Sequence, residues 1–129
     1  MSNLRTVFPD EPKITEPVVK AGRSYAGFDP ASGPDVKLFG AVLDGNHVVR
    51  DFRNADIREA LYGTTADPLD RRRQSAVVGH LLRRLHVRGL IVKVPRSHRW
   101  HVSVKGHQVL AAVVRLYHYG IPAAIATAA

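Results

Sequence analysis

Residues 82–102 read Leu-Arg-Arg-Leu-His-Val-Arg-Gly-Leu-Ile-Val-Lys-Val-Pro-Arg-Ser-His-Arg-Trp-His-Val, and this stretch decides the fold. Before Gly89 the apolar residues recur at helical spacing, and glycine commonly follows the last turn of a helix. After Gly89, two runs rich in apolar and β-branched residues, 90–94 and 99–102, lie on either side of a short segment that begins with Pro95. Two such runs, separated by a few turn-forming residues, predict a β-hairpin directly after a helix.

The helix that ends before Gly89 is the third of four that the sequence predicts. It begins near residue 69 or 70 and runs to 87, after a linker over 64–68. The first predicted helix covers 35–43 and ends at Asp44-Gly45, and the second covers 55–62 and ends at Gly63. A fourth covers 104–118 and is capped by Ser103. The expected fold class is mainly α with one small β-hairpin, an α+β arrangement.

The predicted domain covers residues 35–119, and the segments on either side of it have a different composition. Residues 1–34 contain five of the eight prolines, which predicts an extended Pro-rich arm that is not a packed unit. Two short runs in the arm, at 18–19 and 25–28, either form short strands or lie against the domain surface. Residues 120–129 are an apolar C-terminal tail without charged side chains.

The charge of the chain is concentrated in its second half. The 129 residues include 19 Lys and Arg against 11 Asp and Glu, a formal net charge of +8. From Arg71 to Ala129, eleven basic residues stand without a single Asp or Glu. A concentration of like charge opposes folding and is typical of proteins that bind a polyanion. Nucleic acid is therefore the expected partner.

On a helical wheel, the third predicted helix has one apolar side and one basic side. Its apolar side consists of Val78, Leu81, Leu82 and Leu85. The opposite side, which we call the basic face, consists of Arg72, Arg73, Ala76, His80 and Arg83. Arg71 precedes this face, and Arg84 lies on its flank. A helix about 10–12 Å across fits a DNA major groove roughly 12 Å wide, so the pattern indicates a helix that contacts duplex DNA.

The order of these elements resembles the winged helix-turn-helix DNA-binding domain. The resemblance rests on Leu82-Arg-Arg-Leu-His-Val-Arg-Gly-Leu-Ile91, on Lys93-Val-Pro-Arg-Ser-His-Arg-Trp100, and on Asp51-Phe-Arg-Asn-Ala-Asp-Ile-Arg-Glu-Ala-Leu61, which is similar to the first helix of the motif. Within these segments, Phe52-Arg-Asn, Arg-Arg-Leu and Pro-Arg-Ser-His-Arg are similar to the C-terminal segment of longer bacterial proteins. Two features depart from the pattern: the linker before the third helix is long, and Gly79 lies inside that helix, where it costs about 1 kcal/mol relative to alanine.

The resemblance implies sequence-dependent binding of double-stranded DNA by a regulator or by the DNA-binding end of a larger protein. Residues near the start of the third helix are expected to read base edges, whereas Arg83 and Arg84 contact the phosphate backbone. The hairpin corresponds to the wing, which places Lys93, Arg96, His98 and Arg99 near flanking phosphates or the minor groove. Lys105, near the start of the fourth helix, is expected to add a phosphate contact. Trp100 is expected to pack under the wing.

Several other functions are excluded or left as alternatives. The chain has no cysteine, its histidines do not follow a zinc-binding spacing, and no carboxylate follows residue 70. We therefore expect no enzymatic activity, metal, cofactor or small-molecule ligand. No run approaches a membrane span and no signal peptide is visible, so a cytoplasmic location is expected. Structured RNA and an acidic protein partner stay open as alternatives. A homodimer through the first and last helices also stays open, as does packing of these helices within one chain.

Overall fold

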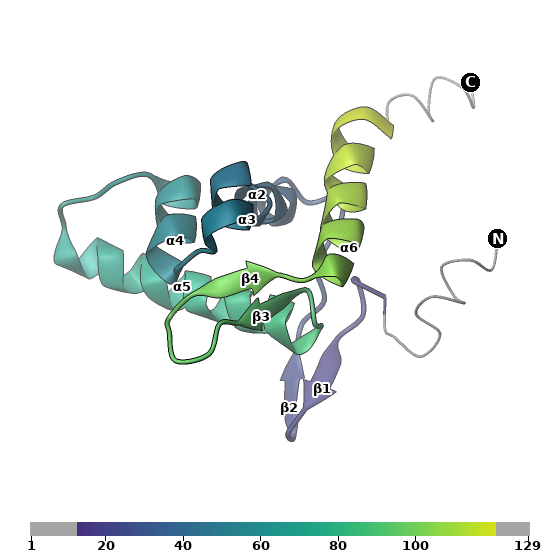
Figure 1. Cartoon of the computed structure of the whole chain (residues 1–129), viewed down its shortest axis with the longest axis horizontal. Coiled ribbons are helices and arrows are strands. Elements are labelled where there is room, and N and C mark those ends of the chain that lie inside the picture. The colour runs from purple at the N-terminus through teal and green to yellow at the C-terminus, as the bar shows by residue number, and fades with distance from the viewer. Residues whose placement is uncertain (1–12, 121–129) are drawn as a thin grey trace.

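A computed structural model describes residues 13–120 of the chain. Within this range, two short strands come first, followed by four helices, a second pair of strands and a long C-terminal helix (Figure 1). The elements are β1 (Val18–Lys20), β2 (Arg23–Tyr25), α2 (Gly33–Val42), α3 (Gly45–Arg50), α4 (Asn54–Tyr62), α5 (Pro68–Val87), β3 (Ile91–Lys93), β4 (Trp100–Val102), α6 (Val104–Arg115) and a π-helical turn, η1 (Leu116–Gly120). The mainly helical α+β class is confirmed.

Short polar side chains begin most of these helices. Ser32 caps α2, Asp67 caps α5 just before Pro68, and Ser103 caps α6, where its Oγ accepts from the amide of Gly106 at 2.9 Å. Each cap satisfies an amide that the first turn of a helix leaves without a partner. The four predicted helices are therefore present, with ends that differ from the prediction by a few residues.

Helix α3 was not predicted. The pair Asp44-Gly45 was expected only to end the preceding helix, but the Asp44 carboxylate accepts from the amide of Asn46 at 2.9 Å and so caps a new one. The new helix is six residues long and has no fully buried side chain, so it lacks the apolar pattern that reveals a helix in a sequence.

The predicted hairpin is present as β3 and β4. The strands are antiparallel, with Ile91 opposite Val102 and Lys93 opposite Trp100. Trp100 also pairs with Phe52, a single extended residue between α3 and α4. The hairpin is therefore attached on its open side to the chain segment that leads into α4.

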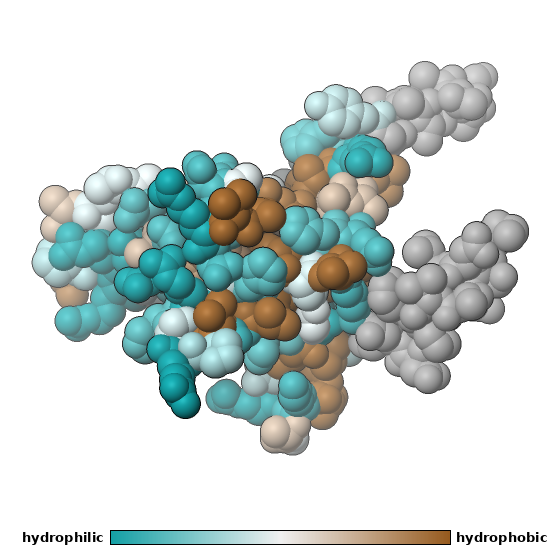
Figure 2. All heavy atoms as spheres, viewed as in Figure 1, coloured by the Kyte–Doolittle hydropathy of each residue, from teal (hydrophilic) through white to brown (hydrophobic). Residues whose placement is uncertain are grey.

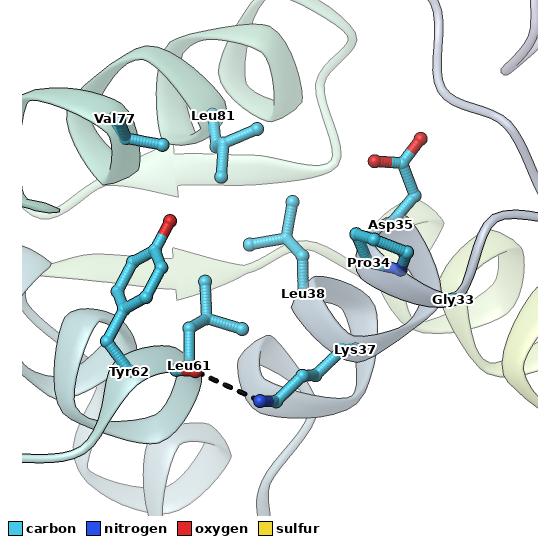
Figure 3. A pocket seen from close by; sticks show the side chains of 9 residues that line it. All are labelled: Gly33, Pro34, Asp35, Lys37, Leu38, Leu61, Tyr62, Val77 and Leu81. Atoms are coloured by element: carbon cyan, nitrogen blue, oxygen red, sulfur yellow. Dashed lines mark hydrogen bonds between the residues drawn. The ribbon is translucent and has the colours of Figure 1, made fainter.

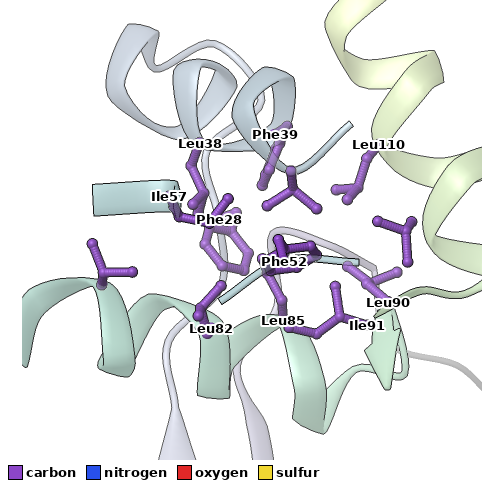
Figure 4. Packing of buried hydrophobic residues seen from close by; sticks show 13 residues of the cluster. Phe28, Leu38, Phe39, Phe52, Ile57, Leu82, Leu85, Leu90, Ile91 and Leu110 are labelled. Carbon is purple, nitrogen blue, oxygen red and sulfur yellow. The ribbon is translucent and has the colours of Figure 1, made fainter. Parts of the chain in front are cut away.

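One hydrophobic core joins α2, α4, α5, α6 and the β3–β4 hairpin (Figure 4). Phe39, Phe52, Ile57, Leu85 and Leu110 are all 0% exposed and come from five different parts of the chain. Trp100 is half-buried and packs against this core, as expected. The core fixes α5 by its apolar side and leaves the other side uncovered.

The described part of the arm is packed, contrary to the prediction that residues 1–34 are extended. Phe28 is 2% exposed and its ring meets that of Phe39 edge-on, with centroids 5.2 Å apart. The Phe28 amide donates to the carbonyl of Ile14 at 2.8 Å, which closes a loop around the β1–β2 hairpin. At Gly27, a Cβ would lie 2.1 Å from the carbonyl oxygen of Thr15, so only glycine fits this crossing. Residues 1–12 lie outside the described range.

Helices α2 and α6, the first and last predicted ones, pack against each other within the chain. Of the two arrangements left open for these helices, packing within one chain is therefore present, and it covers part of the apolar surface that a dimer would use. Of the apolar tail predicted over 120–129, residues 121–129 lie outside the described range. Within residues 13–120, no helix combines the length and the apolar character needed to cross a membrane.

Candidate nucleic-acid interface

Helix α5 is held in place from α4 as well as from the core. Asn54, the first residue of α4, donates from Nδ2 to the carbonyl of Ser75 at 3.0 Å. Arg58, one turn later in α4, donates from Nη1 to the Ser75 Oγ at 3.1 Å. The two bonds meet at a single residue of α5 and join the two helices at that point.

The basic face of α5 points away from this support. Arg72, Arg73, Ala76, His80 and Arg83 are all exposed, whereas Val78, Leu82 and Leu85 on the opposite side are buried. The acidic residues of α5, Asp67 as its cap and Asp70, lie before the basic face begins. The structure therefore brings these five predicted residues together on one continuous surface.

Arg71 does not join this surface. Its Nη1 donates to the carbonyls of Thr65 and Ala66 at 3.3 and 3.4 Å, so the side chain turns back over the linker between α4 and α5. The long linker that departs from the winged-helix pattern is thus tied to the start of α5.

Arg84 is placed differently from the prediction. It was expected to contact phosphates, but its guanidinium donates from Nε to the carbonyl of Ala26 at 3.2 Å and from Nη2 to that of Gly27. The same group lies 4.0 Å above the ring of Phe28. Burial lowers the pKa of Arg84, although Asp35 nearby opposes this effect. Its donors are used to hold the described arm, and we remove it from the candidate interface.

Arg88, one turn beyond Arg84, is a structural residue that the sequence analysis missed. It is only 7% exposed and donates to the carbonyls of Lys13 and Ala26 at 3.2 Å each, and to that of Glu16. Burial lowers its pKa and the positive charge of Arg84 lowers it further, whereas Glu16 raises it. The four-residue spacing of Arg84 and Arg88 in the sequence was a signal that both side chains lie on the same side of the helix.

The tip of the β3–β4 hairpin carries three of the predicted cationic or titratable residues. Lys93, Arg96 and His98 are exposed. Ser97 fixes the turn, since its Oγ donates to the carbonyl of Val94 at 2.9 Å and accepts from the amide of Arg99 at 3.0 Å. In Figure 2, hydrophilic side chains project from the molecule at the position of this tip.

Arg96 at this tip has a left-handed backbone, with φ at +59°. This conformation is unfavourable for a residue with a Cβ. It lets the backbone reverse its direction at the apex of the hairpin, where Arg96 lies.

The base of the hairpin is tied to other elements. Arg99 donates to the carbonyl of Arg50 at 3.3 Å, at the end of α3. His101 contacts the Asp51 carboxylate through Nδ1 at 2.6 Å. His86 of α5 meets the Trp100 ring edge-on, with centroids 5.1 Å apart. Of the four hairpin residues predicted to bind DNA, Arg99 therefore has a structural contact, and the Lys93 Nζ lies 4.5 Å from the centroid of the Trp100 ring. All of Lys93, Arg96 and His98 are exposed.

Lys105 also differs from the prediction. Its Nζ donates to the carbonyl of Arg88 at 2.7 Å, at the C-terminal end of α5, where helices present carbonyls without partners. Burial lowers the pKa of Lys105. The side chain joins α6 to the end of α5, and we remove it from the candidate interface.

A groove of about 450 Å³ lies between α2, α4 and α5, beside the basic face (Figure 3). Leu38, Leu61 and Leu81 point into it, while Tyr62 and Val77 are about half exposed at its rim. Lys37 at one edge donates to the carbonyl of Leu61 at 2.9 Å. The groove is mainly apolar, and Asp35 and Lys37 are the charged residues that line it.

The described residues offer no metal site: between positions 13 and 120, no three His, Asp or Glu side chains are close enough to hold an ion. Comparison of the chain with protein-family models, with curated proteins and with solved structures found no significant match.

Proposed function

We propose that the chain is a winged helix-turn-helix protein that binds double-stranded DNA in a sequence-dependent manner. The order of elements supports the proposal: α4 and α5 follow each other as the helix pair, β3 and β4 follow as the wing, and Phe52 adds a third extended segment beside Trp100. In this arrangement α5 is the recognition helix, and the protein acts as a regulator or as the DNA-binding end of a larger protein.

The single observation that carries the proposal is the basic face of α5. Three arginines and a histidine are exposed on one side of a rigid helix, without an acidic residue among them. Arginine binds guanine through O6 and N7 in the major groove, and it also binds phosphates. Ala76, between these side chains, is small enough to let the helix approach the floor of the groove.

We assign roles along α5 by position. Arg72, Arg73 and Ala76 lie in the first half of the helix and read base edges, because the N-terminal part of a recognition helix commonly enters the groove. Arg83, later in the helix, contacts the backbone. His80 lies between these two regions and contacts either a base edge or a phosphate.

The wing places Lys93, Arg96 and His98 against a neighbouring part of the duplex. Arg96 at the apex is the best placed to enter a minor groove, where the narrow walls concentrate negative potential. The Ser97 bonds that fix the turn reduce the freedom that Arg96 would otherwise lose on binding.

The salt dependence of binding tests this proposal. Five exposed cations carry the interface, namely Arg72, Arg73, Arg83, Lys93 and Arg96. If the three that are assigned to the backbone or the wing, Arg83, Lys93 and Arg96, each neutralise one phosphate, the logarithm of the association constant should fall against the logarithm of salt concentration with a slope of about −2.7. Fluorescence anisotropy with a labelled duplex, from 50 to 300 mM salt, gives this slope. A slope near zero would contradict the proposal.

The same assay separates DNA from the structured-RNA alternative. A-form RNA has a deep and narrow major groove that excludes a helix. Unlabelled duplex RNA should therefore compete far less well than duplex DNA of the same length. Equal competition would show that α5 does not read a major groove.

A protein partner is the second candidate, and the apolar groove beside α5 favours it. Leu38, Leu61 and Leu81 would accept an apolar side chain, and Lys37 at the edge would suit an acidic neighbour. Substitution Leu81→Glu would abolish such binding and leave the basic face intact. Wild-type DNA affinity in that variant, measured on a sample shown to be folded, supports the DNA proposal.

A further inference from the structure

The β1–β2 hairpin has a basic tip that the sequence analysis did not consider. Lys20 and Arg23 face each other across the turn as directly opposed residues, and both are exposed. The two residues between them, Ala21 and Gly22, have φ angles of +54° and +77°. Positive φ at both positions is typical of the tight turns that join two antiparallel strands.

Two like charges opposed across a hairpin repel each other. From Pro17 to Phe28, Lys20 and Arg23 are the only charged residues, so no acidic side chain on the hairpin compensates them. The ion pairs found among residues 13–120 are Arg58–Glu59 and His101–Asp51, and neither involves this tip. An anion bound at the tip would remove the repulsion.

The hairpin is attached to α5 on the side opposite to the β3–β4 hairpin. Arg84 and Arg88 project toward the arm and bind its carbonyls, whereas His86, between them in sequence, contacts Trp100 of β4. The C-terminal half of α5 therefore contacts the arm with its β1–β2 hairpin on one side, and the β3–β4 hairpin on the other side. In Figure 1 the β1–β2 hairpin extends away from the helical body next to the C-terminal half of α5. In Figure 2 hydrophilic side chains lie beside its tip.

The attachment is firm enough to position a binding element. Arg88 binds three carbonyls before and after the hairpin, and Phe28 fixes the strand that leaves it in the core. A basic tip that is already fixed loses little conformational freedom on binding. The same two cations on a free arm would bind phosphates more weakly.

We propose that the tip of the β1–β2 hairpin, through Lys20 and Arg23, binds backbone phosphates of the DNA duplex beyond the segment contacted by α5. This inference rests on the proposed function. It makes the interface three-part, with α5 in the centre and a basic hairpin on either side. Contacts to phosphates add affinity and fix the orientation of the protein on the duplex, without reading the sequence.

The test compares the double variant Lys20→Gln/Arg23→Gln with the full wild-type chain. Binding is measured on duplexes of increasing length that share one central site. Wild-type affinity should rise with length until the flanking phosphates are included, and the variant should not show this last increase. On the longest duplex the salt slope of the variant should be less steep by about 1.8, the value for two phosphate contacts.

The matched control is Lys37→Gln/Arg115→Gln, which removes the same charge from exposed positions on α2 and α6. It should bind long duplexes with the wild-type slope. Circular dichroism and thermal melting of both variants show that the fold is kept. If the salt dependence of binding weakens as much in the control as in the hairpin variant, the effect is one of net charge, and the proposal is contradicted.

The failure of this inference differs from failure of the proposed function. If Lys20→Gln/Arg23→Gln binds every duplex like wild type, while Arg72→Ala/Arg73→Ala loses affinity, only the hairpin proposal is wrong. If the wild-type chain does not bind duplex DNA, both are wrong. A loss confined to long duplexes in the hairpin variant supports both.

Discussion

Phe52 and Trp100 exchange two backbone hydrogen bonds, from the amide of each to the carbonyl of the other, at 3.0 and 2.7 Å. These bonds join a residue between α3 and α4 to the strand β4, nearly fifty residues later. The helix pair α4–α5 and the β3–β4 hairpin therefore form one rigid unit. The proposed recognition of a duplex by a helix and a hairpin together would require this rigidity, because both would have to reach the DNA in one orientation.

The Phe52 side chain supports this junction from the core, where it is 0% exposed. Substitution Phe52→Ala should lower the free energy of unfolding by about 3–5 kcal/mol, the usual range for a buried phenylalanine. Urea denaturation followed by circular dichroism measures this change. Val49→Ala, at a position on α3 that is 82% exposed, is the control and should stay within roughly 0.5 kcal/mol of wild type. A loss below about 1 kcal/mol for Phe52→Ala would mean that the core is not built as described.

Two helical glycines should respond to alanine in opposite directions. At Gly106, a Cβ would lie 2.0 Å from the carbonyl oxygen of Leu90, so Gly106→Ala forces α6 away from β3 and should destabilise the fold by about 1–3 kcal/mol. At Gly79, the nearest atom to a Cβ would be Asn54 Nδ2 at 3.5 Å, an ordinary contact. Gly79→Ala should therefore raise stability by up to about 1 kcal/mol through helix propensity. Thermal melting of the two variants side by side decides both signs.

Arg88 should control the attachment of the described arm. Substitution Arg88→Met keeps the unbranched aliphatic part of the side chain but removes the guanidinium. Three carbonyls then lose their donor. The expected loss is at least about 1.5–3 kcal/mol, the range for a hydrogen bond to a charged group. Limited proteolysis should then cut between residues 13 and 28 well before it cuts α5. Equal protection of this segment in the variant and in wild type would contradict its role.

Arg83 and Arg84 are neighbours in sequence and should differ in function. Arg83→Gln should make the salt slope of DNA binding less steep by about 1, as expected for one lost phosphate contact. On a duplex too short to reach the β1–β2 hairpin, Arg84→Gln should leave the slope unchanged but lower the melting temperature, because its donors hold Ala26 and Gly27. Anisotropy titrations and melting curves of the same two samples provide both values. A reduced slope in Arg84→Gln, with an unchanged melting temperature, would reverse the assignment.

The fold could be predicted from the sequence where periodicity was strong. Helix α5 shows both an apolar and a basic side in its sequence, and Gly89 marks its end. The β3–β4 hairpin follows from two β-branched runs around Pro95. Helix α3 could not be predicted this way, because its six residues bury no side chain fully and depend on Asp44 as a cap. In the sequence, Asp44-Gly45 indicated only the end of α2, so the start of α3 at the same two residues was not recognised.

The candidate site was predicted less completely, and the reason is tertiary contact. A helical wheel separates apolar from basic residues, but it does not show which arginines meet another part of the chain. Arg84 and Lys105 bind carbonyls from segments distant in sequence. The four-residue spacing of Arg84 and Arg88 indicates that they share a helix side, but it does not show what that side contacts. Prolines in the first 34 residues indicated an extended arm. The sequence does not show that Phe28 packs into the core or that Gly27 crosses close to Thr15, because both are contacts between distant segments.

The most direct test of the central claim is the ratio of affinities for a specific and a random duplex, measured for wild type and for Arg72→Ala/Arg73→Ala. The specific duplex is obtained by selection from a random pool with the wild-type protein, and Arg83→Ala, at a residue assigned to the DNA backbone, serves as the control for a loss that affects all sequences equally. If the first half of α5 reads bases, the double variant should reduce this ratio by about tenfold or more, since one good base contact contributes roughly 1–3 kcal/mol of discrimination. A ratio that stays at the wild-type value, while both affinities fall alike, would contradict the assignment of α5 as the recognition helix.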